Sequence, residues 1–486
     1  MFSKPIFKQS VRTNGILWLV ITLVASALLS NFIIRFDPED FSALSVAAEG
    51  TQFGAIFSGF GTILGTLETF YKMVAILLGL VYIIFSANNL VVNEVDSGSM
   101  AYTLSTPIKR STVIFTKMAY MVGSIILMFI VLAGVGMGVS ELVHHNITGS
   151  PITEDVEAAA DAMDRNSSYV RDHLYMIKDD EYAMRSGAEA RSMDTEAYSQ
   201  YLDQAILRDS YKAAAAELTK DRKEKYKDDD DMDKDDIEIT EEELAMDPSM
   251  ILNNNDALSA GAKVTGQSLN DYRAFIGKKA AEMTDGKEAH DTKSDESSQL
   301  PADASMILSI AAKAGAEAID TTETNIQDNM SLLKGDAALK AGAEAANVSE
   351  DQLKDLINSS MVNAALKSDN AMSFDIETFI WLNVGACLLI LAMGSISFFA
   401  STVFNRSNQA MILGAGLPFA FFLISMVIEQ SDSLENLKYF SLTTLFKTDE
   451  ILSNGDFGIP LLILGGIAAV LFAISNVIFC RKDLPL

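Results

Sequence analysis

The acidic side chains near the middle of the chain are the residues best suited to metal chemistry. Asp231, Asp233 and Asp235 alternate with other residues, and Glu242 stands at the twelfth position, as in the calcium-binding loop of an EF-hand. That loop needs glycine at its sixth position, where this chain has Asp236. A solvated acidic segment therefore explains these residues better than a calcium site. The histidines also lack metal-ligand spacing, so we expect no metal site.

Sequence motifs for catalysis are absent from the chain. It contains no GxxxxGK[ST] loop to bind nucleotide phosphates, no GxSxG nucleophile turn and no HExxH zinc helix. We therefore expect no catalytic residues, no enzyme activity and no cofactor in this chain. Cys387 and Cys480 lie in apolar segments and are expected to be free core residues.

Six apolar segments are long enough to cross a lipid bilayer, which requires about twenty apolar residues in a helix. The segments are residues 15–36, 70–92, 117–140, 379–404, 410–428 and 458–479. The predicted fold class is an all-α integral membrane protein with six transmembrane helices and a large helical extracytoplasmic domain between helices 3 and 4.

Basic residues predict the orientation, because short loops rich in Lys and Arg stay on the cytoplasmic side. Every loop that six alternating crossings would place inside carries such residues: Lys4, Lys8, Arg12, Lys109, Arg110, Arg406, Arg481 and Lys482. We expect a multi-pass protein of a bacterial cell membrane, with both termini in the cytoplasm. The centres of the spans are almost free of charge, which argues against a transporter driven by an ion gradient.

Residues 141–375 form a block between the third and fourth spans that carries most of the net charge of −28. Its Ala, Glu, Lys and Leu content predicts a helical domain, interrupted by a charged loop at about 220–243. The sequence therefore divides into residues 1–140, 141–375 and 376–486. The string AGAEA occurs at 314–318 and 341–345, which indicates either a helical repeat or low-complexity alanine usage. The acidic balance excludes a nucleic-acid-binding protein.

The loop between the second and third spans, residues 93–116, carries a recognisable pattern. Acidic residues and Gly98 come first, followed by Leu-Ser-Thr-Pro at 104–107 and then by Lys109 and Arg110. The loop is expected to contain a short helix and a Thr-Pro turn beside the lipid headgroups. This pattern resembles permeases of the ABC-2 type of ABC transporter. The predicted topology, with six spans and both chain ends in the cytoplasm, is also similar to that of this family.

The resemblance implies that residues 93–116 form a coupling helix that docks on a separate ATP-binding subunit, where ATP and magnesium are bound. The residues implied to contact that subunit are Glu94, Asp96, Gly98, Tyr102, Thr103, Leu104, Ser105, Lys109 and Arg110. It also implies a dimer of two permease copies, surrounded by membrane lipid.

The block at residues 141–375 departs from the family pattern, in which the outer link between spans three and four is short. Its negative charge would favour a cationic peptide as substrate, although the same charge can serve solubility alone. We expect a permease subunit of an ATP-driven exporter for an amphipathic, peptide, lipid or drug-like substrate. The alternatives are a membrane sensor or signalling subunit that transports nothing and whose outer domain is moved by an ABC ATPase, and an outer-surface anchor without energy coupling.

Overall fold

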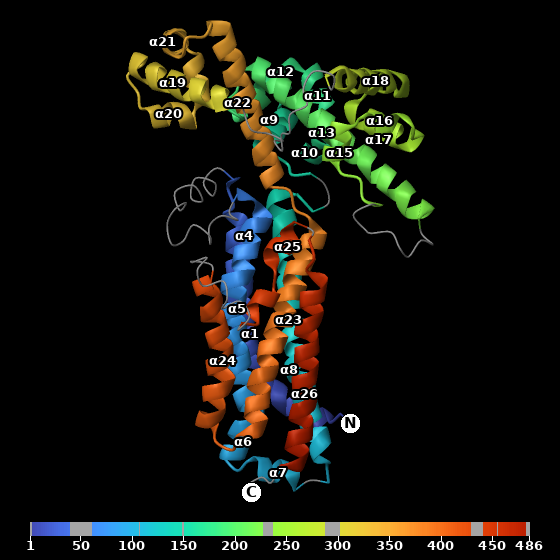
Figure 1. The fold of residues 1–486 in the computed structure, drawn as a ribbon, viewed down its shortest axis with the longest axis vertical. Coiled ribbons are helices and arrows are strands. Elements are labelled where there is room, and N and C mark those ends of the chain that lie inside the picture. Colours follow the sequence, from blue (N-terminus) through green and yellow to red (C-terminus); the bar gives the residue numbers. More distant parts are fainter. Residues whose placement is uncertain are drawn as a thin grey trace. The chain divides into compact units, whose positions relative to one another are not determined.

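The computed structural model describes residues 2–38, 61–105, 107–147, 150–226, 237–286, 302–428, 441–453 and 455–482. Every regular element in these ranges is a helix, so the predicted all-α fold class is confirmed (Figure 1). The chain divides into two compact units. Unit 1 consists of Met1–Pro151 and Asn370–Leu486, and unit 2 consists of Ile152–Asp369.

Among the described residues, six helices are long and apolar enough to cross a membrane, and all of them belong to unit 1. They are α1 (Lys4–Ile34), the composite helix Ile63–Asp96, α8 (Arg110–His144), α23 (Ile376–Val403), α24 (Ser407–Ile428) and α26 (Gly458–Arg481). Most of them extend beyond the predicted apolar segments. The third span, for example, begins at Arg110 rather than at residue 117, because its polar first turns are also helical.

The second span is a composite of short helices with two π-helical segments. Its parts are α4 (Ile63–Thr69), η2 (Phe70–Ala75), α5 (Ile76–Ala87), η3 (Asn88–Val92) and α6 (Asn93–Asp96). It is followed by α7 (Met100–Leu104) and then by α8. Short π-helical turns in α-helices occur frequently at functional sites.

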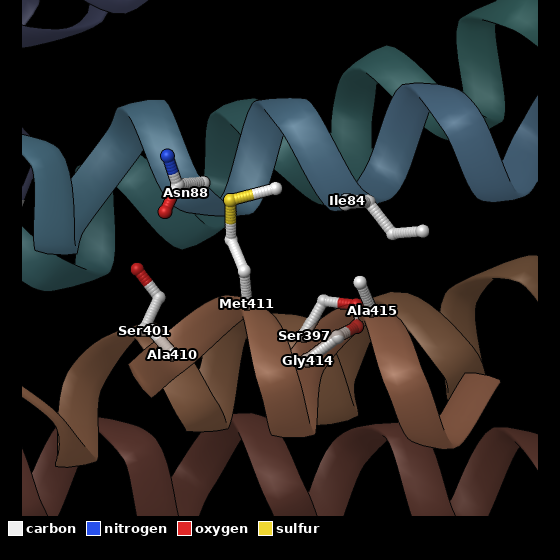
Figure 2. A pocket seen from close by; sticks show the side chains of 8 residues that line it. All are labelled: Ile84, Asn88, Ser397, Ser401, Ala410, Met411, Gly414 and Ala415. Atoms are coloured by element: carbon white, nitrogen blue, oxygen red, sulfur yellow. Dashed lines mark hydrogen bonds between the residues drawn. The ribbon is translucent and has the colours of Figure 1, made fainter. Parts of the chain in front are cut away.

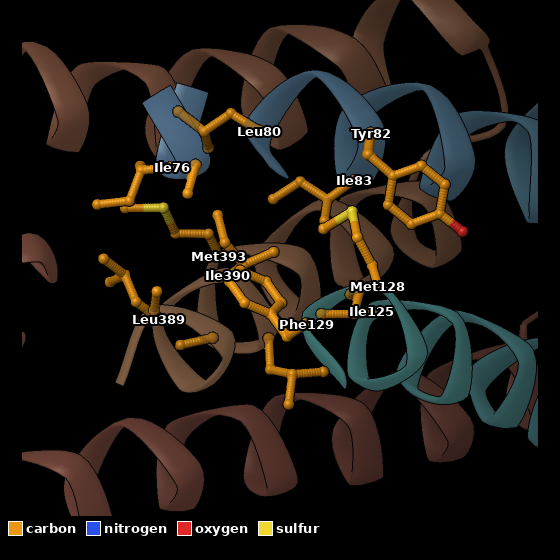
Figure 3. Close-up of a cluster of buried hydrophobic side chains, with 14 of the residues drawn as sticks. Ile76, Leu80, Tyr82, Ile83, Ile125, Met128, Phe129, Leu389, Ile390 and Met393 are labelled. Carbon is orange, nitrogen blue, oxygen red and sulfur yellow. The ribbon is translucent and has the colours of Figure 1, made fainter. Parts of the chain in front are cut away.

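Helix α23 is the most deeply buried of the six spanning helices and packs against α5, α8, α24 and α26. Figure 3 shows part of this core, where Ile83 of α5, Phe129 of α8 and Ile390 of α23 gather. The helices approach closely at glycines: a Cβ atom on Gly79 would lie 2.7 Å from Ile390 Cδ1. This close packing fixes the second and third spans against one central helix.

A polar cluster lies at the α4 end of the second span. The side chain of Glu68 is buried, and its carboxylate lies 2.6 Å from Lys72 Nζ, at the i,i+4 spacing of a helix ion pair. Thr448 of α25 (Thr448–Leu452) also donates a hydrogen bond to Glu68. The buried carboxylate is therefore paired, as a buried charge requires.

The described residues of unit 2 form three separate hydrophobic clusters, each built from a group of helices that we call a module. Module 1 comprises α9 (Glu154–Ala162), α10 (Ser167–Arg171), α11 (Tyr175–Asp179), α12 (Glu181–Ala190) and the first part of α13 (Thr195–Lys225). Module 2 comprises the second part of α13, α15 (Glu241–Met246), α16 (Ser249–Leu252), α17 (Asn255–Thr265) and α18 (Leu269–Gly286). Module 3 comprises α19 (Ala302–Ala318), α20 (Glu323–Asp328), η4 (Met330–Lys334), α21 (Asp336–Ala346) and α22 (Glu350–Ala371).

The charged loop predicted at 220–243 is wrong at both of its ends. Helix α13 continues to Lys225, because Lys, Arg and Glu are good helix formers, and α15 begins at Glu241 with a capping box between Thr240 and Glu243. The middle of this segment, including Asp231, Asp233 and Asp235, lies outside the described residues. Within the described ranges no three His, Cys, Asp or Glu residues are arranged to hold a metal ion.

Candidate functional site

The loop after the second span folds as two short helices joined by a tight turn. Helix α6 ends at Asp96, and Gly98 adopts a left-handed conformation with φ of 74° before α7 begins at Met100. Glycine tolerates this conformation because it has no Cβ atom. The Ser97 and Ser99 hydroxyls donate to the backbone carbonyl of Glu94, which further orders the turn.

Two apolar residues attach this segment to the core of unit 1. The side chains of Val95 and Met100 are buried and belong to the same hydrophobic cluster as the spanning helices. One side of α7 is therefore packed against the spanning helices, and a displacement of α7 would be transmitted directly to them.

The predicted contact residues separate into an exposed group and an inward-facing group. Tyr102 is 81% exposed, an unusual state for a large aromatic residue. The other exposed members are Asp96, Gly98, Ser105 and Lys109. Thr103 is half-buried, and the side chain of Leu104 lies outside the described residues. Glu94 and Arg110 bind partners in their own chain.

Glu94 forms an ion pair with a buried lysine of the third span. Its Oε2 atom lies 2.6 Å from Lys117 Nζ, and the exposed fraction of the Lys117 side chain is 1%. Lys117 also donates a hydrogen bond to the backbone carbonyl of Leu90 in η3. Glu94 and Leu90 precede α7 in the chain and Lys117 follows it, so these bonds join the end of the second span to the start of the third.

Asp96 binds the beginning of the fifth span. Its Oδ2 atom accepts a hydrogen bond of 3.1 Å from the backbone N–H of Ser407, the first residue of α24. The Ser407 hydroxyl in turn donates to Asn88 Oδ1 at 2.7 Å. A carboxylate at a helix N-terminus satisfies a free N–H and interacts favourably with the helix dipole.

The π-helical segment η3 is bound by side chains from its neighbours. Ser401 of α23 donates to the carbonyl of Ala87 at 2.7 Å and accepts from the N–H of Val92 at 3.0 Å. A small pocket adjoins this segment (Figure 2). Figure 2 shows Ile84 and Asn88 on one side of it, and on the other side Ser397, Ser401, Ala410, Met411, Gly414 and Ala415. η3 thus lies where the second, third, fourth and fifth spans meet.

Lys482, just after the last span, binds the C-terminal end of α23 at the same end of unit 1. Its ammonium group donates to the carbonyls of Thr402, Val403 and Phe404 at 2.8–3.1 Å, where α23 ends. A cation is favourable at a helix C-terminus. Burial lowers the pKa of Lys482. Arg110 donates to the Lys482 carbonyl at 3.0 Å, so the predicted contact residue Arg110 joins the third and sixth spans.

The sequence prediction missed several of these residues: Lys117, Ser401, Ser407 and Asn88. Lys117 carried a signal, because an ionisable residue in an apolar span usually has a partner and a role. Ser401 is a polar residue in an apolar span, where such residues commonly form interhelical hydrogen bonds, as it does with Ala87 and Val92. Nothing in the sequence linked Ser407 or Asn88 to Asp96.

Unit 1 is the membrane-spanning part of a multi-pass membrane protein, with an ordered segment at one end and an exposed tyrosine on it. Residues 7–159 match the family model described as ABC-2 family transporter protein. The match covers the first three spans and α7, and it confirms for this part of the chain the resemblance to ABC-2 type permeases predicted from the inner loop. Such permeases normally work with an ATP-binding subunit. Comparison with the curated proteins gives no match.

Proposed function

We propose that this chain is the transmembrane permease subunit of an ATP-driven exporter, and that its ATP-binding partner docks on the exposed side of α7. The partner would hydrolyse ATP with magnesium, and this chain would supply the pathway together with a second permease copy. Tyr102 carries the proposal. It is exposed, it stands on a short helix anchored by Met100, and the family match includes it.

Charge supports a cytoplasmic position for this end of unit 1. Exposed basic residues gather on the elements that surround α7, and both α1 and α26 have one end there (Figure 1). They are Lys4, Lys8, Arg12, Lys109, Arg406 and Arg481. Because basic residues near span ends favour the cytoplasmic side, this arrangement puts α7 within reach of a cytoplasmic ATPase. Unit 2 would then be extracytoplasmic.

The path of force follows from the contacts of α7. A movement of α7 passes to the second span through Val95 and η3, to the third through Glu94 and Lys117, and to the fifth through Asp96. Three spans would therefore respond to one docking surface. The cargo in this proposal is amphipathic, peptide-like, lipid-like or drug-like, and the acidic composition of residues 141–375 would favour a cationic peptide among these.

Replacing Tyr102 by aspartate is expected to abolish co-purification of the ATP-binding subunit from native membranes in mild detergent. The change places a charge where an aromatic side chain would be buried in the interface, and aromatic residues dominate such contacts. Because Tyr102 is 81% exposed, the change should not disturb the packing of its own chain, and the permease should retain its size-exclusion profile. Partner recovery is measured by mass spectrometry.

A matched control is Tyr182→Asp, since Tyr182 is 76% exposed and belongs to unit 2. This variant should recover as much partner as the wild type. Equal recovery of the partner with Tyr102→Asp and with the wild type would refute docking at α7. If no ATP-binding protein co-purified with the wild type, the proposal of an ATP-driven exporter would be wrong.

A further inference from the structure

Unit 2 contains five helical hairpins, among its described residues, whose sequences and structures can be aligned position by position. In each hairpin a small residue lies buried in the first helix, followed by a buried alanine. These small residues are Ala159, Gly187, Gly261, Gly315 and Gly342. The AGAEA strings seen in the sequence supply two of them, at Gly315 and Gly342, and the variant SGAEA supplies Gly187.

The backbone of the hairpins is the same at the turn. The fifth residue after each small residue has a positive φ, between 52° and 68°. These five residues are Asp164, Ser192, Gly266, Asp320 and Asn347. The N–H of the next residue bonds back to the carbonyl of the buried alanine at 2.9–3.1 Å in all five, which is the long hydrogen bond of a Schellman motif.

The second helix of each hairpin also begins in the same way. The seventh residue after the small residue caps it through a side-chain oxygen, and the eleventh is fully buried. The caps are Asn166, Asp194, Ser268, Thr322 and Ser349. The buried residues are Val170, Tyr198, Tyr272, Ile326 and Leu353.

Two of these hairpins pack together in module 1 and two in module 3, whereas the fifth packs on the second part of α13 in module 2. In module 1, α12 packs on α9, and in module 3, α21 packs on α19. In module 2, α17 packs on the second part of α13, where Ser210 and Ala214 take the places of Asp155 and Ala159. The same bond is present in both of the first two modules: Tyr198 donates to Asp155 at 3.0 Å, and Tyr272 donates to Ser210 at 3.2 Å.

Module 1 differs from the other two in a buried charged network. Arg191 Nε lies 2.8 Å from Asp155 Oδ1, and Arg191 Nη2 lies 2.7 Å from Asp369 Oδ1. Tyr201 donates to the other oxygen of Asp369 at 2.7 Å, and the Arg191 guanidinium lies over the Tyr201 ring. Burial, with the charges of Asp155 and Asp369, raises the pKa of Tyr201 well above its usual value, so its hydroxyl stays a donor.

The corresponding positions of modules 2 and 3 are neutral. Arg191 is matched by Thr265 and Ala346, Asp155 by Ser210 and Ala311, and Tyr201 by Phe275 and Leu356. The module therefore folds without these charges. Burying charges costs free energy, so their presence in one copy needs a reason beyond the fold of that copy.

The position of Asp369 supplies this reason. Helix α22 contributes Leu353 and Ile357 to the core of module 3, and farther along it contributes Val362 and Ala365 to the core of module 1. Asp369 stands near its end, shortly before the chain continues into α23. Asp155 stands in α9, shortly after the chain leaves α8. The network thus joins the beginning of unit 2 to its end.

We propose that unit 2 is built from three copies of one helical module, and that Arg191, Asp155 and Asp369 make the first copy a clasp that holds the two ends of the unit together. Module 2 is then connected to module 1 through α13, which both modules share, and module 3 is connected to module 1 through α22. A force on one connection to the spans is passed to the other through Arg191.

Hydrogen exchange of the full chain in detergent, followed by mass spectrometry, tests the clasp. The triple variant Asp155→Asn, Arg191→Met, Asp369→Asn removes all three charges together. Arg208, which lies 3.9 Å from Asp369 Oδ2, keeps its ion pair with Asp209. We expect exchange about tenfold faster or more in α9 and in residues 362–371, and unchanged exchange in α17 and α21. The control Lys178→Met, Asp203→Asn removes an exposed ion pair of the same module and should change neither region.

Three results would overturn the clasp. Unchanged exchange in residues 362–371 would show that the network holds nothing. Faster exchange across all three modules would show that the network stabilises the whole of unit 2 as one cooperative core, and not the two ends of the unit in particular. A triple variant that fails to fold would show that module 1 needs charges that its copies lack.

The modular division has its own test at Gly261. A Cβ atom there would lie 2.2 Å from Tyr272 Oη, whereas a Cβ atom on Gly277 of α18 meets nothing within 4 Å. Gly261→Val should speed exchange at least about tenfold in module 2 alone, and Gly277→Val should leave it unchanged. Equal acceleration in modules 1 and 3 would contradict separate modules.

Discussion

Replacing Glu94 by glutamine is expected to destabilise the detergent-solubilised protein by about 3–5 kcal/mol, because Lys117 would keep its charge with no carboxylate beside it. The two side chains lie 2.6 Å apart, and Lys117 is almost fully enclosed. The measurement is the midpoint of thermal aggregation followed by fluorescence-detected size exclusion. Glu94 is therefore a poor probe of partner docking, since its loss would damage the fold first.

The double variant Glu94→Gln, Lys117→Met separates charge from shape. It removes both charges and keeps similar volumes, and replacement of a whole buried pair is often close to neutral. We expect it to recover most of the lost stability. A double variant as unstable as Glu94→Gln alone would show that the pair does not account for the effect, and an unchanged single variant would show that the pair contributes nothing.

The second large effect is expected at Gly136 in α8. A Cβ atom at this position would lie 2.5 Å from Phe379 Cζ and 3.3 Å from Leu29 Cδ2, so valine would force α23 and α1 away from α8. Overpacking of this kind costs about 1–3 kcal/mol. We expect Gly136→Val to lower the thermal midpoint clearly in the same size-exclusion assay.

Gly134 and Gly138 lie on the same helix and provide the control. A Cβ atom on either one meets nothing within 4 Å. Gly134→Val should therefore leave the midpoint unchanged. If Gly134→Val and Gly136→Val behaved alike, the effect would come from the helix backbone, and the close packing of α8 on α23 and α1 at Gly136 would be wrong.

The spans could be predicted from the sequence because length and apolarity decide them almost alone. Their ends could not, since Arg110 and its neighbours are polar yet helical. The same physics explains the error at α13, where charged helix formers extend the helix to Lys225. A charged segment signals exposure to water, and it does not by itself signal a loop.

The helix of the candidate site was predictable from the sequence, whereas the contacts around it were not. The inner-loop pattern predicted a short helix within residues 93–116, where α7 lies, and the contact residues predicted there include the exposed Tyr102. It could not show that Glu94 and Arg110 face inward, because their partners Lys117 and Lys482 lie on other spans. Which face of a short helix meets the core depends on the fold of the whole unit.

The modules of unit 2 were visible in the sequence only as the AGAEA strings. The rest of the pattern is kept in conformation rather than in residue type: Asp164, Ser192 and Gly266 share a left-handed backbone, and Val170, Tyr198 and Leu353 share burial. Different residues satisfy the same positions, so the repeat appears once the dihedral angles and the hydrogen bonds are known.

Site-specific photo-crosslinking at residue 102 in living cells tests the central claim most directly. A photoreactive phenylalanine analogue replaces Tyr102, and in a second strain it replaces Tyr182 as the exposed control. Docking at α7 predicts a crosslink from position 102 to a protein that carries a GxxxxGK[ST] phosphate-binding loop, and none to that protein from position 182. Crosslinks from position 102 to lipid alone would contradict the account.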